Sequence, residues 1–464
     1  MSTAAEPAGP AALSTPREPR LILLHALASG LDLERYFGWR RHRDGDPFLV
    51  RFPGFGSAVF TGTPAGAREM FRAPVELLEP PLPNPIEPMV GPASLILARD
   101  MRHKRERALL APAFHRNRIS AYGKVIRDAA RAELDGERTG TPWRPGRRVD
   151  AREAARAITL RVILAAVFGI DEPRRLAEYT TVTTEFLNSF GGLLFLIPAL
   201  RRNMFGLSGW ERFTEARNRL DELIDTEIAR RRADGGGGEA VVCKDMLALM
   251  LSTRYDDGTA INDTDLREQL RTLLVAGHET TATSLVWALY RLHREPGTLA
   301  RLRTELAEAG TDLDPAELAK LPYLDAVCQE TLRLHPPVPI VLRRLTGDFT
   351  LRGVPMVAGD TMGVSVHLLH SDPEVWSEPQ RFRPERFLER RYSPFEFAPF
   401  GGGHRRCIGA TLADYELRIV LATMIGAVRL RLSPRFARGR MPLTVPHNIA
   451  TGPHAAITFD VLEP

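Results

Sequence analysis

The segment FGGGHRRCIGA, residues 400–410, decides the fold that we expect for this chain. Three consecutive glycines, 401–403, precede Cys407, and Gly409 follows it. Glycine lets a backbone approach a flat group closely because it has no Cβ. A helix predicted from about residue 408 would place Cys407 at its N-terminus, where free N–H groups stabilise a thiolate. The segment is therefore either a glycine-rich turn with a small apolar cysteine or a loop that offers one thiolate to a metal.

The composition is that of a soluble globular chain. The 464 residues are 44% hydrophobic and 26% charged, with a net charge of +5 and no long basic block, so we expect no nucleic-acid partner. The three cysteines are odd in number and widely spaced, which argues against a disulfide framework. No Cys-x-x-Cys pair occurs, so zinc and iron–sulfur sites are not expected, and Cys243 and Cys328 are interpreted as inert thiols.

The N-terminal segment carries no recognisable membrane anchor. Residues 1–30 are rich in proline and alanine and are predicted to form a disordered tail. The apolar run LILLHALA, residues 21–28, is much shorter than the roughly 20 residues that a membrane span needs. It also lacks the basic segment that begins a signal peptide. These features predict a cytoplasmic protein without a transmembrane anchor.

The periodicity predicts a mainly helical α+β chain. The longest helix is expected from about 263 to 295, between the cap residue Asn262 and Pro296, as a rod of roughly 50 Å. Further helices are expected at 64–71, over most of 99–235 and at 408–427, and short strands at 47–61 and 349–360. Residues 79–97 are expected to form a loop, and the glycine-rich segment 232–242 a flexible linker rather than a domain boundary.

The middle of the long predicted helix has an unusual composition. The segment AGHETT, residues 276–281, puts Gly277 in a helix interior, which costs about 1 kcal/mol relative to alanine. It also puts Glu279 into an otherwise apolar window, where a carboxylate is costly unless it has a role. The alternative is a helix that passes briefly through solvent.

Two other helical segments pair charged residues on one face. Glu330 and Arg333 stand at i and i+3, and Arg386 in RPERF could complete a buried carboxylate–guanidinium cluster. The alternative is a surface ion pair. His103 and Arg107 stand at i and i+4, either as paired donors or as part of a solvated basic face.

The pattern Phe400-x-x-Gly403-x-Arg405-x-Cys407-x-Gly409 resembles the haem-binding loop of the cytochrome P450 family of haem-thiolate monooxygenases. The other three segments follow in the order and approximate spacing of that family. The resemblance runs from about residue 30 to 460 and is firmest between 265 and 425. It implies the P450 fold with a long central helix and a small β lobe, as one haem domain over residues 31–464.

The resemblance also implies roles for individual residues. Cys407 would be the axial ligand of haem b (iron protoporphyrin IX), a role that thiolate ligation suits. Glu279 and Thr280 would be catalytic, delivering protons during dioxygen activation. Glu330, Arg333 and Arg386 would form a structural triad. The other cofactor-binding residues would be His103, Arg107, Arg343 and Arg405 at the propionates, with Ala276, Gly277, Phe400, Gly401 and Gly409 around the ring and the oxygen site. Arg344 is an adjacent rival to Arg343.

The implied activity is hydroxylation or epoxidation of an apolar organic substrate, such as a terpenoid, fatty acid or polyketide, in secondary metabolism. The reaction would use dioxygen and two electrons from a separate ferredoxin and ferredoxin reductase, which a basic surface with Arg102, Lys104, Arg105 and Arg406 could dock. The substrate pocket is expected from 83–97, 183–207, 270–281, 335–342 and 446–451, segments with few charges. Two alternatives are a peroxide-driven peroxygenase and a haem sensor or carrier without turnover.

Overall fold

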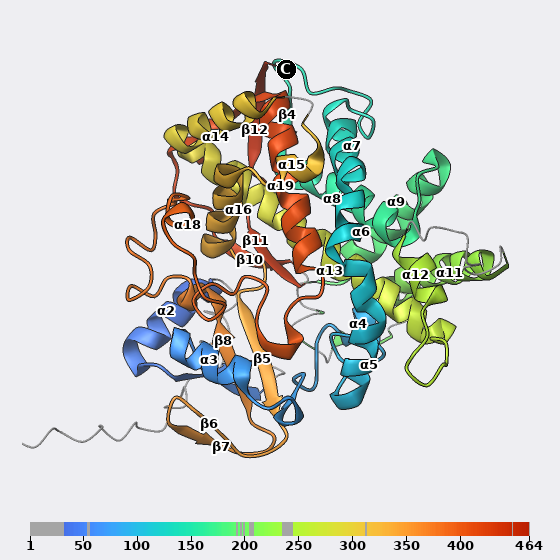
Figure 1. Ribbon diagram of the computed structural model, residues 1–464, viewed down its shortest axis with the longest axis vertical. Helices are drawn as coiled ribbons and strands as arrows, with labels where there is room; N and C mark the ends of the chain where they lie inside the picture. The colour runs from blue at the N-terminus through green and yellow to red at the C-terminus, as the bar shows by residue number, and fades with distance from the viewer. Residues whose placement is uncertain are drawn as a thin grey trace, which may run out of the picture.

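The computed structural model describes residues 32–52, 56–191, 194, 197, 200–203, 208–233, 245–310, 313–447 and 449–463 (Figure 1). The predicted N-terminal tail, Cys243 and most of the predicted linker lie outside the described residues. The helices of eight or more residues are α2 (Leu33–Asp44), α3 (Pro64–Arg72), α5 (Asp100–Leu110), α7 (Gly123–Leu134), α8 (Ala151–Phe168), α9 (Pro173–Ser189), α11 (Gly209–Ala233), α13 (Asp263–Arg294), α14 (Pro296–Ala309), α16 (Pro322–Leu334) and α19 (Ala410–Ala427). Shorter helices are α4 (Glu87–Val90), α6 (Arg116–Ala121), α12 (Met246–Ser252), α15 (Pro315–Leu318), α17 (Val366–Leu369), α18 (Arg386–Glu389) and α20 (Pro434–Arg438).

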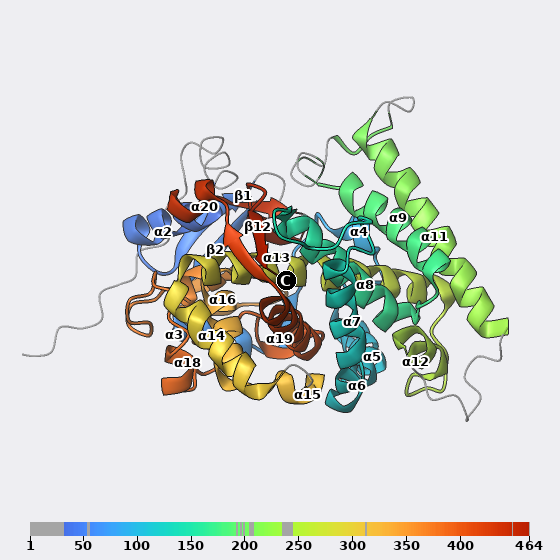
Figure 2. The ribbon, with the colours of Figure 1, turned by 90° about the horizontal axis from the view of Figure 1, so that it is seen from above.

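Helix α13 is the central element, and its predicted bounds are confirmed within one residue. The side chain of Asn262 accepts a hydrogen bond from the N–H of Asp265 and caps the helix. The helix ends at Arg294, and Pro296 begins α14. Its 32 residues span about 48 Å. Helices α8, α16 and α19 contact it, while α9 and α11 form one side of the molecule and α2 and α14 lie on the other (Figure 2).

The β lobe is built around a five-stranded sheet with the order β1-β2-β8-β5-β3. Strands β2 and β8 are parallel, and the other neighbours are antiparallel. The sheet lies beside α2 and α3 (Figure 1). Its strands are β1 (Phe48–Phe52), β2 (Gly56–Thr61), β3 (Leu78–Glu79), β5 (Ile340–Leu345) and β8 (Thr361–Ser365). The predicted strands at 47–61 are therefore confirmed, whereas the predicted loop at 79–97 contains α4.

Three smaller sheets complete the β structure. A three-stranded sheet has the order β4-β12-β9, and two antiparallel ribbons pair β6 with β7 and β10 with β11. The β6–β7 ribbon is the pair of strands expected after residue 348. The bounds are β4 (Arg148–Asp150), β6 (Phe349–Leu351), β7 (Val354–Met356), β9 (Arg429–Leu432), β10 (Thr444–His447), β11 (Ala450–Pro453) and β12 (Thr458–Glu463).

One large hydrophobic core cluster runs from Met89 to Val461 and includes the inner face of α13. Two smaller clusters lie at the five-stranded sheet. The expected fold class, α+β and mainly α, is confirmed by these elements. The domain boundary at residue 31 stays a prediction. Within the described residues, none of the helices combines the length and the hydropathy that crossing a bilayer requires.

Candidate active site

The loop around Cys407 is held by its own backbone. A short 3-10 turn (Gly403–Arg405) precedes the cysteine, and Gly409 is the N-cap of α19. The N–H of Cys407 donates to the carbonyl oxygen of Phe400 at 3.0 Å, which closes the loop. Cys407 is exposed, whereas Cys328 is buried in the core. The loop therefore presents one accessible thiol.

The glycines of this loop serve two purposes. Gly401 and Gly403 have φ angles of +66° and +68°, a conformation that side chains disfavour. A Cβ on Gly402 would lie 2.2 Å from the ring of Phe71, and one on Gly403 would lie 2.6 Å from the Phe71 carbonyl oxygen. Gly402 and Gly403 thus allow the loop to pack on α3. The prediction that the glycines also let the backbone approach a flat cofactor stays a prediction.

Opposing effects act on the pKa of the Cys407 thiol. Although Cys407 has accessible surface, the protein atoms packed around its sulfur raise the pKa of the thiol, whereas the Gly409 N–H and the guanidinium groups of Arg406 and Arg107 lower the pKa by less. The N–H of Gly409 at the start of α19 acts in the expected direction, and the thiolate at Cys407 stays a prediction. Metal binding would itself displace the proton, because a metal-bound cysteine is deprotonated.

Five basic side chains gather near the loop. Burial and the neighbouring positive groups lower the pKa of His103 to about 3 and that of His404 to about 4. The same causes lower the pKa of Arg343 to about 9, and burial lowers the pKa of Arg405 to about 10. Burial also lowers the pKa of Arg107. The two histidines are therefore neutral near pH 7, whereas the three arginines repel one another, so a ligand with carboxylates would stabilise the cluster.

Two buried nitrogen atoms of this cluster have no hydrogen-bond partner among the described residues. They are His404 Nε2 and Arg405 Nε. The rings of His103 and His404 meet edge to face at 5.7 Å. Buried donors without partners require an explanation. The cluster, beside an accessible thiol, fits a cofactor that carries both a metal and carboxylate groups. Sequence reasoning missed His404, although its position between Gly403 and Arg405 was a signal.

The structure distinguishes Arg343 from its neighbour Arg344. Arg344 forms an ion pair with Glu79 of β3. Arg343 lies within electrostatic range of Arg405, His103 and His404. The geometry therefore favours Arg343 as the member of the cluster.

The 276–281 segment lies in the middle of α13 and has two different faces. Ala276, Gly277 and Thr280 are half-buried, whereas His278 and Glu279 are buried. The hydroxyl of Thr280 donates to the carbonyl oxygen of Ala276 at 2.8 Å. The side chain of Thr280 thus belongs to the more accessible side of the helix.

Gly277 serves the contact between α13 and α8. A Cβ at this position would lie 2.7 Å from Cδ1 of Ile163, closer than side-chain atoms approach one another. The missing Cβ therefore allows the close crossing of α13 and α8, and the place of Gly277 beside the oxygen site stays a prediction.

Glu279 forms an ion pair that sequence reasoning missed. Both of its carboxylate oxygens accept hydrogen bonds at 2.9 Å from Arg156 on α8. The side chain of Glu279 is 4% exposed and that of Arg156 is 31% exposed. Next to this pair, His278 Nδ1 and the hydroxyl of Thr159 are 2.9 Å apart. The Glu279 carboxylate therefore points to α8. Its partner Arg156 extends from this buried carboxylate to the protein surface.

Comparison with known proteins decides the family. The family model described as cytochrome P450 matches residues 17–446. The chain belongs to the cytochrome P450 family. The P450 relatives include putative cytochrome P450 135B1 of Mycobacterium tuberculosis (strain ATCC 25618 / H37Rv), which is 34% identical over 95% of this chain and 89% of the relative. Putative cytochrome P450 138 of the same strain is 33% identical over 91% of each chain.

A solved P450 structure has the same fold. The chain described as retinoic acid bound cyanobacterial CYP120A1 superposes with a TM-score of 0.78 at 24% identity, over 92% of this chain and 93% of that one. Membership of the P450 family makes this chain a monooxygenase oxidoreductase with haem b as its cofactor. P450 enzymes generally take electrons from separate redox partners and act on apolar substrates.

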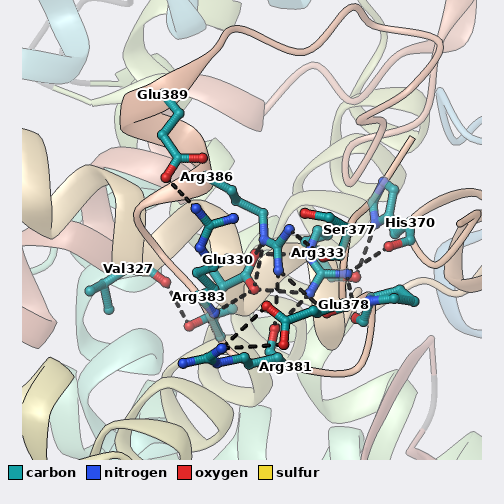
Figure 3. A network of polar contacts seen from close by, with 12 residues as sticks. Val327, Glu330, Arg333, His370, Ser377, Glu378, Arg381, Arg383, Arg386 and Glu389 are labelled. Atoms are coloured by element: carbon teal, nitrogen blue, oxygen red, sulfur yellow. Dashed lines mark hydrogen bonds and ion pairs between the residues drawn. The ribbon is translucent and has the colours of Figure 1, made fainter. Parts of the chain in front are cut away.

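A buried ion cluster of this P450 lies between α16 and the start of α18 (Figure 3). Glu330 accepts from Arg333 Nε at 2.7 Å and lies 3.1 Å from Arg386 Nε. The three side chains are at most 1% exposed. The N–H of Arg383 also donates to Glu330, at 2.8 Å. The structure thus brings together the three residues of the predicted triad.

His370 connects this cluster to the cysteine loop. Its Nδ1 lies 3.1 Å from the carbonyl oxygen of Arg333, and its Nε2 accepts from the N–H of Ala398 at 2.9 Å. The N–H of Gly401 in turn donates to the carbonyl oxygen of Ala398. Burial and Arg333 lower the pKa of His370 to about 3, so the ring is neutral. His370 was another residue that sequence reasoning missed.

A cavity of about 570 Å³ lies between α4, α11 and the first turns of α13. It includes residues from the expected pocket segments 83–97, 183–207 and 270–281. Seven of its 13 lining residues are arginine, aspartate or glutamate. This cavity is therefore more charged than the apolar substrate pocket that we expect, and the lining of that pocket stays a prediction.

Proposed function

We propose that this P450 inserts one oxygen atom of dioxygen into a C–H bond or a double bond of a largely apolar substrate. The observation that carries the proposal is the accessible Cys407 thiol beside a cluster of basic side chains with unpartnered buried nitrogens. In the overall reaction, the substrate, dioxygen, two electrons and two protons give the oxidised product and one water.

The cofactor would be held from two sides. Cys407 would bind the iron as a thiolate, and His103, Arg107, Arg343 and Arg405 would bind the two propionates, for which imidazole and guanidinium donors are suited. Phe400, Gly401 and Gly409 would position the cysteine, and Ala276 would border the cofactor from α13. Haem with a thiolate ligand supplies the activation of dioxygen.

Glu279 and Thr280 would supply the two protons. The Thr280 hydroxyl is held by the Ala276 carbonyl and belongs to the accessible side of α13. Glu279 is paired with Arg156, which reaches the surface. We propose that Glu279 exchanges protons with solvent when it separates from Arg156, and that Thr280 passes them on. A positioned acid of this kind contributes about 10²–10⁴-fold to a rate.

The electrons would come from a ferredoxin and its reductase. Arg102 and Arg105 of the expected docking surface are already paired with Asp265 and Asp257. Lys104 and Arg406 are exposed. We therefore assign Lys104 and Arg406 as the cations that meet an acidic partner. Such rim charges act mainly on the association rate and its salt dependence.

The ligand assignment is tested by the spectrum of the reduced carbon monoxide complex. The wild-type protein and a Cys328→Ala control should show the red-shifted Soret band of thiolate ligation. Cys407→Ala should lose that band, and its retention would refute Cys407 as the ligand.

Turnover separates the proposed monooxygenase from its two alternatives. Ferredoxin, reductase, NAD(P)H and a lipophile should together give oxygen consumption and product. Product from hydrogen peroxide alone, at a rate equal to that with the electron donors, would favour a peroxygenase. No product under either condition, with haem bound, would favour a sensor or carrier.

A further inference from the structure

A small cavity of about 270 Å³ lies between α20, residues 439–443 and the end of β11. Helix α20 lies at the edge of the molecule (Figure 2). Four apolar side chains form much of the wall: Phe436, Pro442, Leu443 and Ala455. None of the residues assigned above to the cofactor or to oxygen chemistry lines this cavity. It is therefore separate from the site around Cys407.

The charged side chains at the cavity are all basic. Arg435, Arg440 and His454 line it, and no acidic side chain does. On the neighbouring strand β9, Arg431 pairs with Asp460 at 3.5 Å, whereas Arg435 and Arg440 have no ion-pair partner among the described residues. Two guanidinium groups therefore border one small cavity without a compensating negative charge.

Hydrogen bonds to the backbone hold the frame of the cavity in place. Arg294, the last residue of α13, donates to the carbonyl oxygens of Phe436 at 2.8 Å and Gly439 at 2.9 Å. The N–H of His454 donates to the carbonyl oxygen of Leu443 at 2.8 Å. The two sides of the cavity are thus fixed to the central helix and to the β10–β11 ribbon.

The turn after α20 brings the two arginines to the same cavity. A Cβ on Gly439 would lie 2.3 Å from the carbonyl oxygen of Arg435, so this close turn requires a glycine. The turn returns Arg440 to the cavity that Arg435 lines. The guanidinium of Arg435 lies 5.5 Å from the centroid of the Phe436 ring, within the range of a cation–π contact, which orients it.

The charge and the size of the cavity select the kind of ligand. A phosphate monoester carries about −1.5 to −2 charges at pH 7, which two guanidinium groups would balance. Each guanidinium fork can bind two phosphate oxygens. The apolar walls suit an ester with an apolar group. That group must be small, because pockets for drug-sized ligands measure about 300–1,000 Å³.

We propose that this cavity binds a phosphate monoester that carries a small apolar or aromatic group, with Arg435 and Arg440 as its anion-binding residues. Leu443 and Pro442 contact the apolar group. A bound ester would touch both ends of the β10–β11 ribbon, through Leu443 and His454. The inference goes beyond the proposed monooxygenase function and does not rest on it.

The test is a calorimetric titration of the ferric haem-loaded protein with phenyl phosphate at low ionic strength and pH 7.5. Inorganic phosphate and phenol probe the anion and the apolar group separately. Phenyl phosphate should bind more tightly than either, and its affinity should fall as salt is added. Arg435→Gln and Arg440→Gln should each weaken it by about 5- to 10-fold, as expected for charge-assisted bonds of partly exposed groups.

Two further variants separate the apolar wall from the charge. Leu443→Ser should weaken phenyl phosphate and leave inorganic phosphate unchanged. The matched control is Arg438→Gln, because Arg438 is exposed on α20 between the two arginines and does not line the cavity. This control should leave both affinities unchanged, and thermal unfolding verifies that every variant is folded.

Three outcomes would overturn the proposal. Equal affinities for phenyl phosphate and inorganic phosphate would mean an adventitious anion only. Equal losses in the Arg438 and Arg435 variants would mean a general charge effect, and no binding of phenyl phosphate would exclude the site. The carbon monoxide spectrum does not depend on these residues, so failure of this inference is distinguishable from failure of the proposed function.

Discussion

At the scale of single residues, Glu279 and Thr280 differ more than their adjacency suggests. Thr280 belongs to the accessible side of α13, whereas the Glu279 carboxylate is bonded to Arg156 on α8. The two groups exchange protons only if Glu279 changes partners. The ion pair with Arg156 is therefore part of the proposed relay.

We expect Thr280→Ala to lower the ratio of product formed to NAD(P)H consumed, with the difference released as hydrogen peroxide. The physical reason is that a late proton lets reduced oxygen escape before its bond breaks. Thr280→Ser keeps the hydroxyl and should retain the wild-type ratio. Glu279→Gln should instead slow turnover by about 10²-fold or more, because proton supply is cut upstream. Unchanged coupling in Thr280→Ala would reject this relay.

At the scale of elements, the crossing of α13 and α8 depends on Gly277. Gly277→Ala gains about 1 kcal/mol in helix propensity. It also places a Cβ 2.7 Å from Cδ1 of Ile163. Overpacking of a filled core typically costs about 1–3 kcal/mol, so we expect net destabilisation. Ile163→Val removes the clashing methyl group, and chemical denaturation of both single variants and the double variant measures the coupling.

In that cycle, the double variant should be more stable than the sum of the single changes predicts. If Gly277 instead opened space for oxygen, Gly277→Ala would impair coupling at unchanged stability. Ile163→Val would then give no rescue.

The sequence predicts the features of an element that depend on neighbouring residues, and it does not predict contacts between residues far apart in the chain. The bounds of α13 depend on Asn262 and Pro296, which act within one turn, and both were identified. The partners of Gly277 and Glu279 stand on α8, more than a hundred residues earlier, so no local pattern could name Ile163 or Arg156. The same holds for Phe71, against which the loop glycines pack. The cysteine loop was identifiable because its pattern is contiguous.

At the scale of the whole molecule, Glu330 of α16 holds Arg386, the first residue of α18. Glu330→Ala would leave Arg333 and Arg386 buried without a counter-charge. Breaking a buried pair costs about 3–5 kcal/mol, against a total stability of about 5–15 kcal/mol for a typical protein. We expect little soluble, haem-loaded protein. Glu378→Ala removes a carboxylate that is 59% exposed in its pair with Arg381, and should fold normally. Normal thermal stability of Glu330→Ala would contradict the structural role.

His370 extends the same network to the cysteine loop and makes it sensitive to acid. Its pKa is lowered to about 3 by burial and Arg333, whereas an unfolded chain has a histidine pKa of about 6.5. Between these values the unfolded state binds a proton that the folded state does not. His370 therefore supports the fold above pH 6.5, and this support is lost as the pH falls, by about 1.4 kcal/mol per pH unit.

We therefore expect His370→Gln to be less stable than wild type at pH 7, because the bonds to Arg333 and Ala398 are disturbed, but to lose stability less steeply on acidification. Urea unfolding of the haem-loaded proteins at pH 7, 6 and 5 measures how steeply the free energy of unfolding of each protein falls with pH. His42→Gln is the matched control, because His42 is exposed on α2 and its replacement should leave the wild-type slope unchanged. Parallel curves for wild type and His370→Gln would mean that the ring is already protonated in the folded protein. The statement that a neutral His370 ring connects the ion cluster to the cysteine loop would then be refuted.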